Sequence, residues 1–132
     1  MKIVADTNLL VRLAVSDDPG HRRIAAHAVK EAEAVIVGNL ALSEMVWVLR
    51  SRYHFSKTEI ALTIRNLCGV RNVVVDRAAV EAGLAAMESG ADFADAAIAY
   101  EGAWLGGETF VSFDQKAVAA LEKQGQKVKL LG

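Results

Sequence analysis

Short apolar runs of strand length alternate with longer helical patterns along this chain, and this alternation restricts the fold more than any other feature. We expect strands at residues 3–5, 34–37, 73–75 and 109–111, with an edge strand over 127–131. Helical patterns separate these runs. Strands that alternate with helices are typical of a parallel sheet covered by helices. The sequence therefore predicts an α/β class fold, a three-layer α/β/α domain with a central, mainly parallel sheet of four to five strands.

The expected helices have recognisable start and stop signals. They cover residues 8–15, 19–33, 40–53, 56–67, 76–88, 93–105 and 115–123. Ser56 and Glu59 form a capping-box pattern, Asp18 precedes Pro19 at a helix start, and Gly125 follows the last helix. The 132 residues contain no repeat or linker, so we expect a single domain over 1–132.

The overall charge excludes a protein held on nucleic acid by bulk positive charge. The net charge is −1, and a nuclease of this composition would need local basic groups or metal ions to hold phosphate. The single cysteine, Cys68, has no partner for a disulfide or a thiolate metal site. No segment reaches transmembrane length and the first apolar run is too short for a signal peptide. We therefore expect a soluble, cytoplasmic protein without a membrane partner.

Three aspartates follow expected strands directly, where ligands collect in open α/β sheets. Asp6, Asp76 and Asp114 hold these positions. Each also has a structural interpretation, because aspartate is a preferred N-cap wherever a helix follows a strand. Position alone does not choose between the two interpretations.

Glu44 lies on an expected helix whose same-face neighbours carry no positive charge. Leu40, Ala41, Trp47 and Val48 surround it at helical spacing. Burying an unpaired carboxylate on such a face is costly, so a metal ion or a distant arginine would have to compensate it. The alternative is that the helix turns this stripe towards solvent.

Asp92 and Asp95 open another expected helix. Asp92 suits the N-cap and Asp95 the first turn, where negative charge is favoured by the helix dipole. The alanines around Asp95 allow other backbones to approach closely. One of the two acids can cap the helix while the other points into a site.

Taken together, Asp6, Glu44, Asp95 and Asp114 form an acid-only ligand set from separate parts of the chain. Carboxylates are the ligands that Mg²⁺ and Mn²⁺ prefer. Four crowded carboxylates repel one another without a cation, so a bound metal also solves an electrostatic problem. Phosphodiester hydrolysis by a metal-activated water is the chemistry that suits such a site.

These acids, in this order, resemble those of the PIN-domain nucleases, in particular the compact VapC-type toxins. The matching pieces span nearly the whole chain: Asp6-Thr7-Asn8, Ser43-Glu44, Asp92-Phe93-Ala94-Asp95-Ala96 and Ser112-Phe113-Asp114. The resemblance implies a Mg²⁺- or Mn²⁺-dependent endoribonuclease of a type II toxin–antitoxin pair. It also implies an RNA substrate, a cognate antitoxin and a homodimer.

By the same resemblance, Asp6, Glu44 and Asp95 correspond to the core metal-binding acids and Asp114 to a more variable fourth. Asn8 and Ser112 correspond to polar supporting positions, with Ser112 where threonine is common. Asp92 could share or support the role of Asp95. Asp76 matches no family position, which favours a capping role. The antitoxin would bind to the two helices between residues 40 and 67 and place a basic side chain in the acidic pocket.

The remaining candidates are basic residues that could contact RNA and aromatic residues that could pack or stack. Arg12 and Lys116 lie close in sequence to Asp6 and Asp114, so they are the candidates for RNA phosphate contacts. We expect Trp47, Phe93 and Trp104 to serve core or dimer packing rather than base stacking, which needs exposed aromatic rings.

Two alternatives to an RNA-cleaving toxin remain open, and a third is disfavoured. The acids could serve a nuclease that acts on DNA or processes nucleic acid outside a toxin pair. They could merely cap helices in a non-catalytic binding module. An aspartyl phosphotransferase is disfavoured, because such enzymes usually carry a second aspartate where this chain has Asn8.

Overall fold

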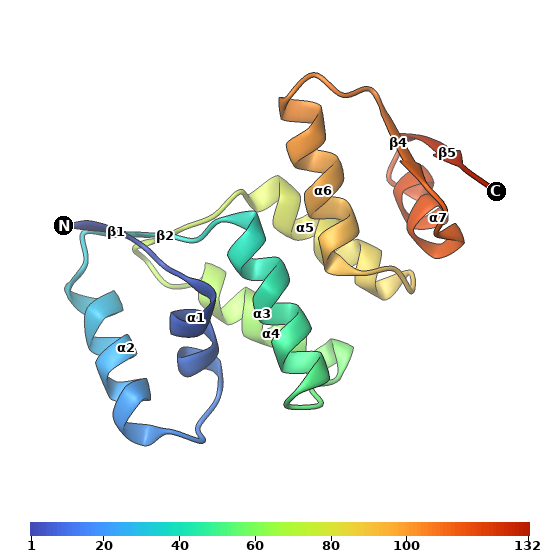
Figure 1. Cartoon of the computed structure of the whole chain (residues 1–132). Helices are drawn as coiled ribbons and strands as arrows, with labels where there is room; N and C mark the ends of the chain where they lie inside the picture. The colour runs from blue at the N-terminus through green and yellow to red at the C-terminus, as the bar shows by residue number, and fades with distance from the viewer. The chain divides into compact units, whose positions relative to one another are not determined.

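The computed structural model describes residues 1–132 and divides into two compact units, Met1–Asp76 and Arg77–Gly132, called unit 1 and unit 2 below. The order of their helices and strands follows the expected alternation (Figure 1). The prediction of one domain over 1–132 remains a prediction. None of the helices is both long and apolar enough to span a lipid bilayer.

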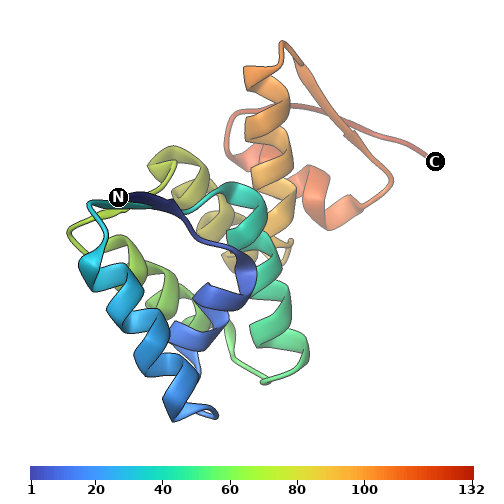
Figure 2. The same ribbon diagram turned by 60° about the vertical axis from the view of Figure 1, so that its left-hand side comes forward.

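Unit 1 contains three short parallel strands and four helices. The strands are β1 (Lys2–Val4), β2 (Ala34–Ile36) and β3 (Val73–Val74), in the order β1-β2-β3. The helices are α1 (Thr7–Ala14), α2 (Pro19–Glu31), α3 (Asn39–Ser51) and α4 (Lys57–Cys68). In both views of the ribbon the helices extend to the same side of these strands (Figure 2).

The two faces of the unit 1 sheet differ in burial. Ile3, Val35 and Val73 are in register on one face, where Val35 and Val73 are buried. Val4 and Ile36 belong to the other row, together with Val74, and their side chains are exposed. Side chains alternate between faces along a strand, so one face of this sheet is covered within unit 1 and the other is not.

Unit 2 contains three helices and a parallel pair of strands. The elements are α5 (Arg77–Glu88), α6 (Phe93–Trp104), β4 (Thr109–Ser112), α7 (Gln115–Lys123) and β5 (Lys127–Leu130). β4 and β5 pair in parallel, with Phe110 opposite Val128. The core is rich in alanine, and Ala86 and Ala96 are fully buried in it. These small side chains let α5 and α6 pack closely.

The α/β class and the parallel pairing of the strands are confirmed; the five strands form a three-stranded sheet in unit 1 and a two-stranded sheet in unit 2, where one central sheet of four to five strands was predicted. The local start signals are also confirmed: the Glu59 backbone N–H donates to Ser56 Oγ, and the Ser56 N–H donates to Glu59 Oε1. Most bounds differ by one or two residues. The helix expected over residues 19–33, for instance, ends at Glu31 because the backbone becomes extended at Ala32.

Candidate metal centre

Asp6 lies at the carboxyl edge of the unit 1 sheet and caps the helix that follows. β1 ends at Val4, and the Asp6 side chain accepts a hydrogen bond of 2.9 Å from the backbone N–H of Leu9. This Oδ1 contact is the N-cap that strand-to-helix geometry favours. The carboxylate is exposed, as is the predicted supporting residue Asn8 on the first turn of α1.

Glu44 lies on α3, which packs against α1, and its side chain is exposed to solvent. Leu40 and Trp47, one turn to either side, are also exposed. The helix therefore turns this stripe outward, the alternative that the sequence left open. Because the carboxylate is not buried, the cost of an unpaired buried charge no longer argues for a bound metal at Glu44.

Asp92 and Asp95 together form the start of α6. Asp92 is the N-cap residue, and its backbone N–H donates a 3.0 Å hydrogen bond to Asp95 Oδ2. Asp95 therefore closes the first turn of its own helix, and its side chain is half-buried while Asp92 is exposed.

The pKa of Asp95 is raised above its ordinary value. Burial has the largest effect because it disfavours the charged form, and the negative charges of Asp92 and Asp114 add to it. The hydrogen bond from the Asp92 N–H acts in the opposite direction. Asp92 and Asp114 therefore lie close enough to Asp95 to disfavour its ionisation, an effect that a bound cation would oppose.

Asp114 connects β4 to α7. Its Oδ1 accepts hydrogen bonds from the backbone N–H groups of Lys116 at 2.9 Å and Ala117 at 3.2 Å, so it caps α7. The Ser112 hydroxyl accepts a 3.0 Å hydrogen bond from the Asp114 backbone N–H. Ser112 thus holds the turn that carries Asp114, and its supporting role in a site stays a prediction.

The structure brings some of the predicted site residues together. In unit 2, Asp92 and Asp114 lie near enough to Asp95 to affect its pKa, and in unit 1 Asp6 and Glu44 lie on neighbouring helices. No group of three or more His, Cys, Asp or Glu side chains has the arrangement of a formed metal site. Asp76 is half-buried directly before α5, and its capping role stays a prediction.

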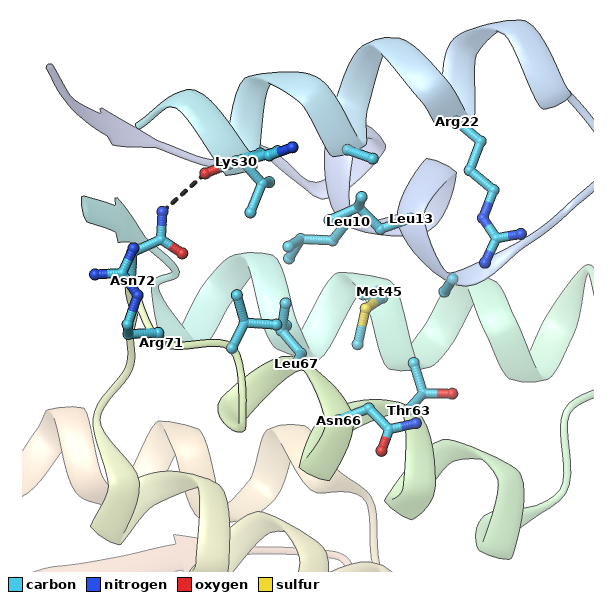
Figure 3. A pocket seen from close by; sticks show the side chains of 14 residues that line it. Leu10, Leu13, Arg22, Lys30, Met45, Thr63, Asn66, Leu67, Arg71 and Asn72 are labelled. Atoms are coloured by element: carbon cyan, nitrogen blue, oxygen red, sulfur yellow. Dashed lines mark hydrogen bonds between the residues drawn. The ribbon is translucent and has the colours of Figure 1, made fainter. Parts of the chain in front are cut away.

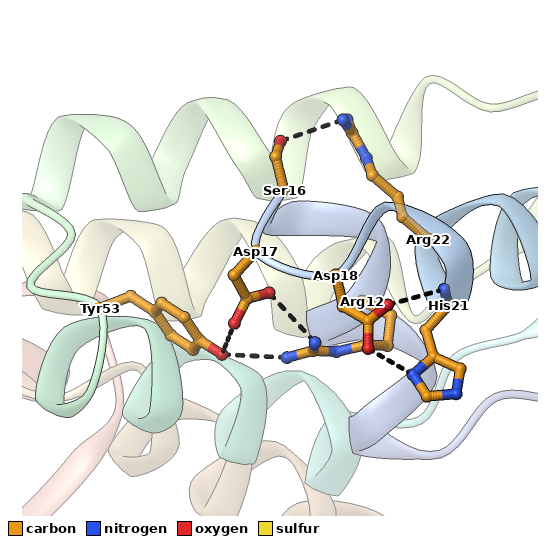
Figure 4. Close-up of polar contacts among 7 residues, drawn as sticks. All are labelled: Arg12, Ser16, Asp17, Asp18, His21, Arg22 and Tyr53. Carbon is orange, nitrogen blue, oxygen red and sulfur yellow. Dashed lines mark hydrogen bonds and ion pairs between the residues drawn. The ribbon is translucent and has the colours of Figure 1, made fainter.

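The two candidate phosphate-binding cations have different surroundings. The guanidinium of Arg12 donates to Asp17 Oδ1 at 3.1 Å and to the Tyr53 hydroxyl at 2.9 Å (Figure 4). The Tyr53 hydroxyl in turn donates to Asp17 Oδ2 at 2.9 Å. The hydrogen bond with Tyr53 has the largest effect in raising the pKa of Arg12, and the charge of Asp17 adds to it. Lys116 is exposed at the start of α7.

The cycle of Arg12, Asp17 and Tyr53 was not predicted from the sequence. It ties the end of α1 and the loop after it to the turn that follows α3. Arg12 and Tyr53 are 41 residues apart, so no local pattern pairs them. At the start of α2, His21 contacts the N-cap residue Asp18 through its backbone N–H and its ring, and these contacts lower the pKa of Asp18 (Figure 4).

The aromatic residues divide into two groups. Phe93 is 2% exposed, which confirms its expected place in the core. Trp47 and Trp104 are 64% and 84% exposed, so core packing was the wrong expectation for both. Their helices present these rings outward, and the dimer packing expected for them is untested.

Comparisons with known proteins found a family model and a similar solved structure. A sequence model of the PIN domain family matches residues 3–122. Among solved structures, the chain is similar to VapC20 of Mycobacterium tuberculosis, a toxin that cleaves the sarcin–ricin loop. The identity is 19% and the TM-score 0.43, over 91% of this chain and 95% of the other. A comparison with curated proteins gave no match.

Proposed function

Because this chain belongs to the PIN domain family, we propose that it is a divalent-metal-dependent endoribonuclease in which Asp6, Glu44, Asp95 and Asp114 hold Mg²⁺ or Mn²⁺. The observation that supports the proposal is the proximity of Asp92 and Asp114 to the half-buried Asp95, whose pKa is raised first by burial and then by those two charges. Helix caps alone do not require a third carboxylate near the first two. An oxygen-only, negatively charged set of donors fits a hard cation.

The proposal also includes a single domain over residues 1–132. The match to the family model supports this, because it extends through unit 1 and most of unit 2. A bound cation would activate a water molecule and neutralise phosphate charge. The chain's own residues would do the positioning: the α6 start holds Asp95 through the Asp92 N–H, and Ser112 holds the turn of Asp114. Asn8 would support Asp6.

The wider proposal is the toxin of a type II toxin–antitoxin pair, with an RNA substrate, a cognate antitoxin and a homodimeric state in the cytoplasm. It rests on the resemblance of the four acidic motifs to VapC-type toxins. Lys116 would contact RNA phosphate. Arg12 would contact RNA phosphate either while it keeps its hydrogen bonds to Asp17 and Tyr53 or after those bonds break.

The decisive test is cleavage of total RNA by wild type and an Asp95→Asn variant, with Mn²⁺, Mg²⁺ or EDTA. We expect metal-dependent cutting that falls by at least about a hundredfold in the variant, because asparagine cannot supply the negative charge. Asp76→Asn is the matched control, since it removes one acid outside the proposed centre. Cutting that persists in EDTA would refute the metal dependence, and equal cutting by Asp95→Asn would refute its role.

A binding module whose acids only cap helices is the second candidate. It is favoured by the observed capping contacts of Asp6 and Asp114. The two candidates differ in thermal melts with Mn²⁺, because a ligand that binds only the native state raises the melting temperature. We expect a rise in wild type that is lost in Asp6→Asn and in Asp95→Asn. Loss in Asp95→Asn alone would place the metal in unit 2 without Asp6.

A further inference from the structure

An exposed tryptophan lies one helical turn from a proposed metal-binding acid on α3. Trp47 follows Glu44 by three residues, a spacing that places two side chains on the same face of a helix with Cβ atoms about 5–6 Å apart. The Trp47 side chain is 64% exposed, and the Glu44 carboxylate is also exposed. The indole ring and the carboxylate therefore share one solvent-exposed face of α3.

The opposite face of α3 accounts for the packing of this helix. Met45 lies there, buried at the base of a cavity whose other walls come from α1, α2 and α4 (Figure 3). Leu42 and Leu49 are fully buried as well. The helix is thus held in the core without Trp47, so truncating the indole removes surface and opens no cavity.

The Trp47 ring has an acid on one side and a cation on the other along the exposed face. Leu40, one turn before Glu44, is 70% exposed, so two apolar side chains flank the carboxylate. Arg50, one turn after Trp47, is exposed and forms no ion pair. A single exposed apolar side chain is ordinary. This one lies between an acid proposed to bind metal and an unpaired guanidinium, which are two groups that phosphate requires.

We propose that Trp47 stacks on a nucleobase of single-stranded RNA whose phosphate is held at the proposed metal centre. The inference rests on the proposed function, because it takes RNA as the ligand. Unpaired bases in loops and single strands stack on exposed aromatic side chains, whereas the bases of a duplex are already stacked on one another. Arg50 neutralises a neighbouring phosphate, the usual companion of a stacking ring in single-strand binding sites.

The spacing along α3 suits one nucleotide. The phosphate belongs at the Glu44 end, and its base meets the indole about 4.5 Å further along the helix axis. Stacking tolerates any base, because every base has a π-face. Trp47 therefore sets a preference for single-stranded over duplex RNA and leaves the choice of base to other contacts.

Intrinsic fluorescence tests the stacking directly, because the chain has two tryptophans. In Trp104→Phe the emission comes from Trp47 alone, and in Trp47→Phe it comes from Trp104 alone. Each full-length variant is titrated with a short single-stranded oligoadenylate and with the same strand in a duplex. The titrations are run in EDTA and in Ca²⁺, a cation that also takes carboxylate ligands.

We expect the single strand to quench the Trp47 emission saturably in at least one of these conditions. The duplex should bind at least about fivefold more weakly, which corresponds to the loss of one base–aromatic stack. The emission of Trp104, which is 84% exposed in unit 2, should not respond. An absence of Trp47 quenching in both conditions would overturn the proposal.

Variants of the same ring test its contribution to affinity, measured by the anisotropy of a labelled oligoadenylate. Trp47→Ala should weaken binding at least about fivefold, whereas Trp47→Phe, which keeps an aromatic ring, should retain most of the affinity. Trp104→Ala is the matched control, because it removes an equally exposed indole away from the proposed acids and should leave binding unchanged. Thermal melts establish that each variant is folded.

The outcomes separate this inference from the proposed function. RNA cutting by a chain whose Trp47 emission ignores the single strand would overturn the stacking alone. Quenching without any cutting in Mn²⁺ would support the stacking and contradict the nuclease. Equal loss of affinity in Trp47→Ala and Trp104→Ala would overturn the stacking. So would a Trp47 emission that changes with protein dilution and not with RNA, because the ring would then pack against a second copy of the chain.

Discussion

The backbone N–H of Asp92 donates to Oδ2 of Asp95 at 3.0 Å, so the first turn of α6 fixes a carboxylate that its neighbours repel. The hydrogen bond and the helix dipole favour the charged form of Asp95. Burial and the charges of Asp92 and Asp114 disfavour it, and these effects prevail. The protein thus holds an acid in a position that is unfavourable without a compensating charge.

The stability of the metal-free protein should therefore depend on pH through Asp95. An acid whose pKa is raised by folding stabilises the folded state below its unfolded pKa, and this contribution is lost as pH rises through the folded pKa. In EDTA, Asp95→Asn should melt at a higher temperature than wild type at pH 7, and the difference should shrink towards pH 3. Glu88→Gln, at an exposed acid, is the control. A difference that is constant with pH would contradict the prediction.

Gly83 should tolerate no side chain. A Cβ at this position on α5 would lie 2.5 Å from Cδ2 and Cε2 of the buried Phe93 ring. Gly83→Ala should lower the free energy of unfolding by about 1–3 kcal/mol, measured by urea denaturation. Gly102→Ala on α6 is the matched control, because its Cβ would meet nothing within 4 Å. It should raise stability by about 0.5–1 kcal/mol through helix propensity. Equal changes in the free energy of unfolding for the two variants would mean that contact with Phe93 does not cause the loss at Gly83.

The capping box at the start of α4 should contribute measurably to stability. Ser56→Ala removes the acceptor for the Glu59 N–H and should cost about 1 kcal/mol in unfolding free energy at pH 7. Thr58→Ala, two residues on and exposed, removes a hydroxyl outside the box and serves as control. The pKa of Glu59 is lowered by its hydrogen bonds with Ser56, so its own contribution is present at neutral pH and is lost as pH falls through that lowered pKa.

The Tyr53 hydroxyl should hold the α1–α2 loop in place. Tyr53→Phe removes the acceptor for Arg12 and the donor to Asp17 together, and Arg12 Nε is already buried without a partner. We expect a lower melting temperature and faster amide hydrogen exchange in residues 15–18. Tyr100→Phe in unit 2 is the control. Unchanged exchange in the loop would show that the Arg12–Asp17 pair suffices alone.

Local signals predicted the helices well because their causes lie within a few residues. Asp114 caps α7 through N–H groups two and three residues on, and the helix runs over Gln115–Lys123 as predicted. The Ser56–Glu59 box was likewise predictable from two residues that lie three positions apart. The carboxyl-end positions of Asp6 and Asp114 followed from the order of strands and helices.

Only the tertiary structure decided which side chains face solvent and which distant ones meet. The sequence determined the order of elements, their caps and the candidate acids, since these depend on backbone geometry and neighbours within one helical turn. Packing between separate elements decides the exposure of Glu44, the bonds of Arg12 to Tyr53 and the effect of Asp114 on Asp95. Such contacts arise only when loop closure brings those elements together, so no local pattern encodes them.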